Sequence, residues 1–207
     1  INIFIGLNLL LLCSASADPA LKKYFTANAA YNRKLYSVAS TQFENFLKAH
    51  SSHPKADLAL RGLGLSHYAL KQYNEAIPCF SKLISKNNLD KTINRERIII
   101  LQGQCLLQSS QKSEAKDLFT NEVQSLTNPI YKNSALAFII DISFGNSNWD
   151  DVVKWTSIIK NSKPSPDQLT RAIYQMGFAY YQKDQITEAI KALNSSSDNK
   201  ISDKWKT

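Results

Sequence analysis

The chain has 207 residues, of which 43% are hydrophobic and 20% charged, with a net charge of +8 and a pI of about 9.3. This hydrophobic fraction is enough to bury a continuous core, which excludes a wholly disordered protein. The basic residues are scattered rather than gathered in a run, which argues against a polybasic segment that binds nucleic acid or lipid. We therefore expect no nucleic acid among the partners.

The first seventeen residues have the features of a secretory signal. They carry no charge, and an apolar run from Leu7 to Cys13 is followed by the small residues Ala15, Ser16 and Ala17. Such a segment is too short for a membrane span and predicts a signal peptide over residues 1–17, cleaved before Asp18. We therefore expect an exported protein, with the periplasm as its compartment.

Two departures from an ordinary signal affect this interpretation. The chain starts with Ile1 and shows no basic leader end, so we expect that its first few residues are missing. Leu11 and Leu12 stand where a lipoprotein signal has small residues, which disfavours a lipid on Cys13. An outer-membrane-associated lipoprotein is therefore the less favoured alternative.

After residue 18 the apolar residues recur with the period of helices. Pro54, Pro129 and the segment 161–166 separate successive units, because the residue before a proline avoids the helical region. Short polar turns divide each unit into two helices, and such short connections make the paired helices antiparallel. The expected helices are 20–33, 36–50, 55–70, 73–86, 92–109, 112–125, 130–145, 149–161, 166–183 and 186–195.

Small residues recur in these helices at a nearly fixed spacing. In the second helices the small residues follow one another at steps of 37, 39, 37 and 37 residues. These residues are Ala39, Ala76, Ala115, Val152 and Ala189. In the first helices Gly64, Gly103 and Gly177 recur in the same way. Small residues at these places let paired helices approach closely, while Phe80 and Leu83 fill the seam between them.

The pattern of Gly64, Tyr68, Tyr73, Ala76 and Phe80 resembles the tetratricopeptide repeat, a helix–turn–helix unit of about 34 residues. The resemblance implies an all-α fold, a right-handed α–α superhelix (solenoid) of about five repeats within residues 18–198. Residues 199–207 are then expected to begin a further repeat or to be a truncated end. Because no polar capping helix is seen there, we expect self-association through an uncapped C-terminal repeat.

The sequence offers no arrangement typical of an enzyme. It contains no nucleophile elbow, no Walker glycine loop and no dinucleotide fingerprint. His50, His53 and His67 do not have the spacing of metal ligands. Cys79 and Cys105 lie on apolar helix faces typical of free buried thiols, with a single disulfide between them as the alternative. We therefore predict no catalytic residue, no metal and no cofactor.

The fourth repeat is the least regular. Its expected first helix, 130–145, is apolar nearly all round, which indicates burial by both neighbours. Asp141 lies within this helix, and a buried carboxylate needs a partner. The sequence does not identify that partner.

The resemblance also implies which side chains line a groove, because the first helix of each tetratricopeptide pair lines the concave face. Tyrosine and arginine are frequent at binding hot spots, since each combines apolar area with a polar group. The alternative is that some of the tyrosines, such as Tyr68, pack between repeats. The residues predicted to bind a partner are Tyr24, Asn28, Tyr31, Arg61, Tyr68, Arg97, Gln104, Gln108, Arg171, Tyr174, Phe178 and Tyr181.

One subtype of the family is not expected. Chaperone-binding members grip a C-terminal carboxylate with lysine and asparagine side chains on neighbouring repeats. Asn28 matches one of these positions, but Tyr24, Leu58 and Leu65 stand where basic or amide residues are required. A carboxylate clamp is therefore disfavoured.

We expect a non-catalytic scaffold that binds a partner protein or peptide on its concave face, in association with the bacterial cell envelope. In this it resembles periplasmic tetratricopeptide proteins. One alternative is a regulatory or substrate-recruiting arm of a larger enzyme or of a secretion or assembly machine. A third is a binder of anionic envelope polymer, whose affinity would fall with salt.

Overall fold

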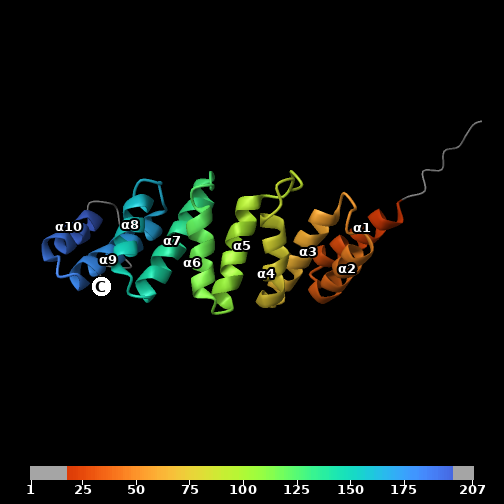
Figure 1. Ribbon diagram of the computed structural model, residues 1–207, viewed down its shortest axis with the longest axis horizontal. Coiled ribbons are helices and arrows are strands. Elements are labelled where there is room, and N and C mark those ends of the chain that lie inside the picture. The colour runs from red at the N-terminus through yellow and green to blue at the C-terminus, as the bar shows by residue number, and fades with distance from the viewer. Residues whose placement is uncertain (1–17, 198–207) are drawn as a thin grey trace, which may run out of the picture.

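The computed structural model describes residues 18–197, so the predicted signal peptide 1–17 and the segment 199–207 lie outside the described residues. The described part consists of helices in five antiparallel pairs, which follow one another along one axis (Figure 1). The prediction of an all-α superhelical repeat fold is thus confirmed. The helices are α1 (Pro19–Asn32), α2 (Tyr36–Ala49), α3 (Ala56–Ala69), α4 (Tyr73–Ile84), α5 (Arg95–Gln108), α6 (Lys112–Glu122), α7 (Pro129–Gly145), α8 (Trp149–Ile159), α9 (Pro166–Gln182) and α10 (Ile186–Ser197).

Most of the first helices begin at a side-chain cap. Asp18 accepts a hydrogen bond from the Ala20 N–H, and Asn128 accepts one from the Ile130 N–H. Asn94 accepts a hydrogen bond from the Arg97 N–H and caps α5, which starts at Arg95, three residues later than predicted. Ser165 and Gln168 form a capping box at the start of α9. These caps fix where the first, third, fourth and fifth repeats start.

The turns inside the pairs share one conformation that the sequence did not reveal. In each of them the second residue after the first helix has a left-handed backbone, with φ between 55° and 62°. The following N–H donates to the carbonyl five residues earlier, for example Gln72 to His67. This is the Schellman arrangement that closes a helix and reverses the chain. The left-handed residues, which recur at the repeat spacing, are Lys34, Lys71, Ser110, Ser147 and Asp184.

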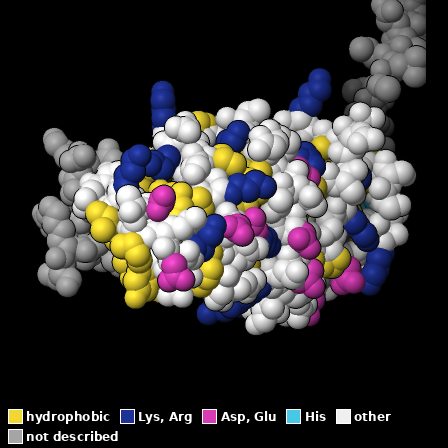
Figure 2. All heavy atoms as spheres, turned by 60° about the vertical axis from the view of Figure 1, so that its left-hand side comes forward, with side chains coloured by type: hydrophobic (Ala, Val, Ile, Leu, Met, Phe, Trp, Pro, Cys, Tyr) yellow, Lys and Arg dark blue, Asp and Glu magenta, His cyan; other side chains and the backbone are white. Residues whose placement is uncertain are grey.

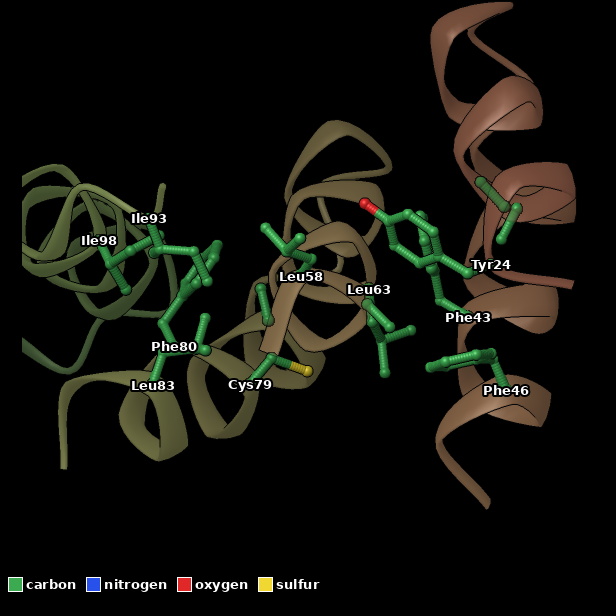
Figure 3. Packing of buried hydrophobic residues seen from close by; sticks show 14 of the residues in the cluster. Tyr24, Phe43, Phe46, Leu58, Leu63, Cys79, Phe80, Leu83, Ile93 and Ile98 are labelled. Atoms are coloured by element: carbon green, nitrogen blue, oxygen red, sulfur yellow. The ribbon is translucent and has the colours of Figure 1, made fainter. Parts of the chain in front are cut away.

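The paired helices approach closely where the first helix carries a glycine. A Cβ atom on Gly64 would lie 2.7 Å from Cε1 of Phe80, and one on Gly103 would lie 2.0 Å from Cζ of Phe119. Figure 3 shows Phe80 and Leu83 in the seam beside the first helices. These contacts confirm that the small residues permit close helix packing.

The fourth repeat reverses the sizes of these two residues. Ile140 stands at the glycine position and Thr156 at the position of Phe80 and Phe119, and both are buried. The Thr156 hydroxyl donates to the carbonyl of Ala172 at 3.3 Å, so its polar atom is satisfied. A large residue on the first helix and a small one on the second therefore fill the space that glycine and phenylalanine fill elsewhere.

The stack has an inner and an outer layer. First helices contact one another, as α1 contacts α3, α5 contacts α7, and α7 contacts α9, whereas the second helices pack against first helices on both sides. The first helices therefore form the inner, concave side of the curved stack. Among the helices of residues 18–197, none is long and apolar enough to cross a membrane.

Candidate partner-binding site

Three predicted residues come together on the concave side of the first three repeats. Tyr31 is half-buried at the end of α1, and burial raises the pKa of its hydroxyl. The positive charges of Arg97 and Arg61 oppose this rise of the pKa, so both guanidinium groups act electrostatically on the Tyr31 hydroxyl. Within the described part of the chain neither arginine forms an ion pair. Their charges are therefore available to a partner.

One carboxylate lies close to this group. The hydroxyl and the N–H of Thr92 both donate to Asp90 and lower its pKa, and the nearby Lys55 and Arg61 lower it further. Asp90 lies in the loop between α4 and α5. The positive charge of Arg61 is thus partly balanced by Asp90, whereas Arg97 is exposed at the start of α5.

The second and third repeats are joined through their first helices. The hydroxyl of Tyr68 donates to Oε1 of Gln104 at 3.1 Å, and its ring meets Tyr73 edge-on with centroids 5.9 Å apart. Gln108 is exposed one turn beyond Gln104. Tyr68 therefore packs within its repeat and bonds to the next one, as the packing alternative expects, and its contact with a partner stays a prediction.

Tyr24 belongs to the core rather than to the open surface. Only 7% of it is exposed, and its ring lies 6.3 Å from that of Phe43 and 6.0 Å from that of Phe46 (Figure 3). The ammonium group of Lys55 lies 6.0 Å from the ring centroid. The aromatic side chains of α2 thus cover the Tyr24 ring. Asn28, one turn further along α1, keeps a half-exposed side chain.

The predicted residues of the fifth repeat form a separate group. Tyr174, Phe178 and Tyr181 line a cavity of about 260 Å³ together with residues of α10, such as Ile186 and Ile190. Phe178 also packs against Phe144 and Trp149, with ring centroids 5.3 and 5.8 Å apart. This group occupies the last described pair of helices, far along the stack from Arg61 and Arg97 (Figure 1).

Arg171 supplies the missing partner of Asp141. Its Nη2 lies 3.0 Å from Oδ2 of Asp141, and the Gln175 amide donates to Oδ1 at 2.9 Å. Burial nevertheless raises the pKa of the Asp141 carboxyl, against the opposing effects of these two partners. Because Arg171 is already paired, it offers a partner less charge than Arg61 and Arg97 do.

His53 and the two cysteines of the described residues have structural surroundings. Nε2 of His53 lies 2.8 Å from Asp18, and its Nδ1 accepts from the Lys55 N–H. Cys79 and Cys105 are free and buried, and burial raises their pKa values to about 11 and about 12. Over residues 18–197 there is no group of three or more His, Cys, Asp or Glu that could hold a metal ion.

Comparisons with known proteins agree with this architecture. A family model described as tetratricopeptide repeat matches residues 58–87 and 171–196. The search of curated proteins returned no match.

Several solved structures are similar. A crystal structure of MamA protein is 17% identical with a TM-score of 0.64, and the match covers 88% of this chain and 96% of that one. The structure of YrrB, described as a TPR protein with an unusual peptide-binding site, is 18% identical with a TM-score of 0.62, covering 86% and 85%. MamA 41-end from Desulfovibrio magneticus RS-1 is 14% identical with a TM-score of 0.59, covering 89% and 96%. At these identities the likeness shows the fold alone, and the family model identifies tetratricopeptide repeats at residues 58–87 and 171–196.

Proposed function

We propose that this protein is a non-catalytic scaffold that binds a partner protein or peptide on the concave side of its first three repeats. The tetratricopeptide fold supports a role in protein–protein interaction, and the similar YrrB structure is described as having a peptide-binding site. The observation that carries the proposal is that Arg61 and Arg97 form no ion pair within residues 18–197 and that the charges of both act on the Tyr31 hydroxyl of the first repeat. Three repeats contribute to this group, so a partner held there contacts several repeats at once.

The chemistry of the group favours a partner segment with a carboxylate. A guanidinium group binds a carboxylate through two parallel hydrogen bonds, and such charge-assisted bonds are the stronger ones. Tyr31 and Tyr68 add apolar area beside the charges, with hydroxyl groups that can bond to a peptide backbone. The binding residues in this proposal are Asn28, Tyr31, Arg61, Tyr68, Arg97, Gln104 and Gln108.

We also propose that the protein works in the bacterial cell envelope after export. The support is the apolar leader that ends in small residues before Asp18. Cleavage there would leave the α1 cap at the new N-terminus, since Asp18 accepts from the Ala20 N–H. N-terminal sequencing of the protein isolated from a periplasmic extract tests this: a first residue of Asp18 is expected, and an uncleaved chain in the cytoplasm would contradict it.

The partner can be captured from the groove itself. A photoreactive phenylalanine at Gln108, which is exposed on α5, should crosslink the partner in living cells. The same residue at Lys82, which is exposed on the outer helix α4, is the matched control. A partner that crosslinks from Lys82 but not from Gln108 would contradict a concave binding site.

The captured partner then allows binding to be measured. Arg61→Ala and Tyr68→Ala should each weaken binding by more than about 1 kcal/mol, the usual threshold of a hot spot. Lys82→Ala, which removes a charge from the outer side, should leave the affinity unchanged. Binding to an anionic polymer would instead weaken with both variants that remove charge, Arg61→Ala and Lys82→Ala, and would collapse at high salt.

A further inference from the structure

The two ends of the described stack carry exposed apolar side chains. The N-terminal face consists of Leu21, Phe25, Ala29, Leu35 and Val38, which line a cavity of about 720 Å³ on α1 and α2. Phe25, Leu35 and Val38 are 55%, 52% and 47% exposed. Large apolar side chains are seldom left exposed together unless they form a binding surface.

The opposite end has a surface of the same kind. The C-terminal face consists of Tyr174, Tyr181, Ile186, Ile190 and Leu193 on α9 and α10, which are between 41% and 60% exposed. The cavity that they line has no polar surface. Figure 2 shows hydrophobic side chains gathered at this end of the molecule.

These two faces are the halves of an interface that the chain already uses between its repeats. Gly62 of the second repeat lies against the ring of Phe43 of the first, since an added Cβ would come within 2.4 Å of it. Phe138 of the fourth repeat stacks on Phe119 of the third, with centroids 5.2 Å apart and planes 12° apart. The contact therefore joins one position of a first helix to one position of the preceding second helix.

The repeat steps place the end residues at these same positions. Phe25 corresponds to Gly62 and Phe138, and Leu193 corresponds to Phe43 and Phe119. Phe25 is exposed because, within residues 18–197, no repeat precedes α1. The N-terminal face therefore has the register that would continue the stack from the C-terminal face.

We propose that a second copy of this chain places its N-terminal face on the C-terminal face of the first, so that the solenoid continues head to tail. Phe25 of the second copy then lies beside Leu193 and Ile190, as Phe138 lies beside Phe119. The two faces differ, so the contact is heterologous and each copy keeps one open face for the next. Assembly would give chains of copies rather than closed dimers.

The ion pair between the fourth and fifth repeats is not repeated at the proposed junction. Lys183 binds Asp150 across the boundary of the fourth and fifth repeats, at 2.5 Å. By the repeat steps Arg33, which lines the N-terminal cavity, corresponds to Lys183, and Thr187 corresponds to Asp150. The C-terminal face thus carries Thr187 where the fourth repeat has a carboxylate, so the fit of the two faces rests on their apolar side chains.

Mixing of two variants tests the proposal directly. Phe25→Lys places a charge on the N-terminal face, and Ile190→Lys places one on the C-terminal face. Because both side chains are exposed, the fold should survive, which far-UV circular dichroism would show. Sedimentation of the full chain over a range of concentrations should show growing assemblies. Each variant alone should self-associate at least about tenfold more weakly. An equimolar mixture should form a dimer and stop there, because it contains one intact face of each kind.

A variant outside both faces serves as the control. Ile130→Lys changes a side chain that is 72% exposed at the start of α7, away from both faces, and should assemble as the unchanged chain does. A chain that stays monomeric at every concentration would overturn the proposal and indicate that terminal segments of the same chain cover the faces. Undiminished assembly of Phe25→Lys would overturn it in favour of two C-terminal faces that pair with each other.

Discussion

The hydroxyl of Tyr68 donates a hydrogen bond to Oε1 of Gln104 across 3.1 Å, which links the first helices of the second and third repeats. Both residues were predicted to bind a partner, and both lie on the concave layer of helices. The bond holds the Tyr68 ring in one orientation beside Tyr73. The surface that a partner meets is therefore ordered before binding, which lowers the entropy cost of association.

Tyr68→Phe removes this bond and keeps the ring. We expect a loss of about 1 kcal/mol in the free energy of unfolding, the usual net contribution of one hydrogen bond. Urea denaturation measures it. In a double-mutant cycle with Gln104→Ala the two losses should not add. Additive losses would mean that the bond contributes nothing to stability.

Gly103→Ala tests the close approach of α5 and α6. The new Cβ would fall 2.0 Å from Cζ of the buried Phe119 ring, so we expect a loss of about 1–3 kcal/mol, the usual cost of overpacking. The control is Gly145→Ala at the end of α7, where an added Cβ meets nothing within 4 Å. It should be neutral or stabilising by about 0.5 kcal/mol. Equal effects of the two changes in thermal unfolding would contradict the packing described.

Lys71→Gly tests the left-handed turns. Lys71 has φ of 59°, a conformation that costs a residue with a side chain roughly 1–2 kcal/mol and costs glycine nothing. Because glycine loses more chain entropy on folding, we expect a net gain of less than about 1 kcal/mol. Lys82→Gly, in the last turn of α4, should instead destabilise the chain by up to about 1 kcal/mol. A destabilised Lys71→Gly chain would show that the turn is not strained.

Two carboxyl groups should give opposite dependences on pH. Burial raises the pKa of Asp141 on folding, so the stability of the chain relative to Asp141→Asn should fall as the pH rises from about 4, where aspartate ionises in the unfolded chain. The hydrogen bond with His53 lowers the pKa of Asp18. Stability relative to Asp18→Asn should therefore be lost as the pH falls below about 4. Unfolding measured across the acid range checks both signs, and parallel slopes would contradict them.

Much of the fold could be predicted because its determinants are local. Pro54, Pro129 and Pro166 lie at boundaries between repeats. The small residues at the repeat spacing lie where paired helices contact each other. The left-handed turns escaped prediction because Lys71 and Ser110 are not glycine, the residue that ordinarily signals this conformation.

The site was harder to predict because it depends on neighbours far along the chain. The pattern placed Tyr24 on the inner side of its helix, but Phe43 and Phe46 of α2 bury its ring. The partners of Asp141 are Arg171 and Gln175, which come from another repeat. The apolar character of the end faces depends on which repeats cover them, and sequence periodicity alone does not show this.

One measurement tests the central claim most directly. Calorimetry would compare the affinities of the Arg61→Ala and Lys82→Ala chains for the partner that is captured at Gln108. We expect the groove variant to bind at least about fivefold more weakly, which corresponds to a loss of about 1 kcal/mol, while the outer variant binds as the unchanged chain does. Equal affinities of the two variants would contradict a binding site on the concave side of the first three repeats.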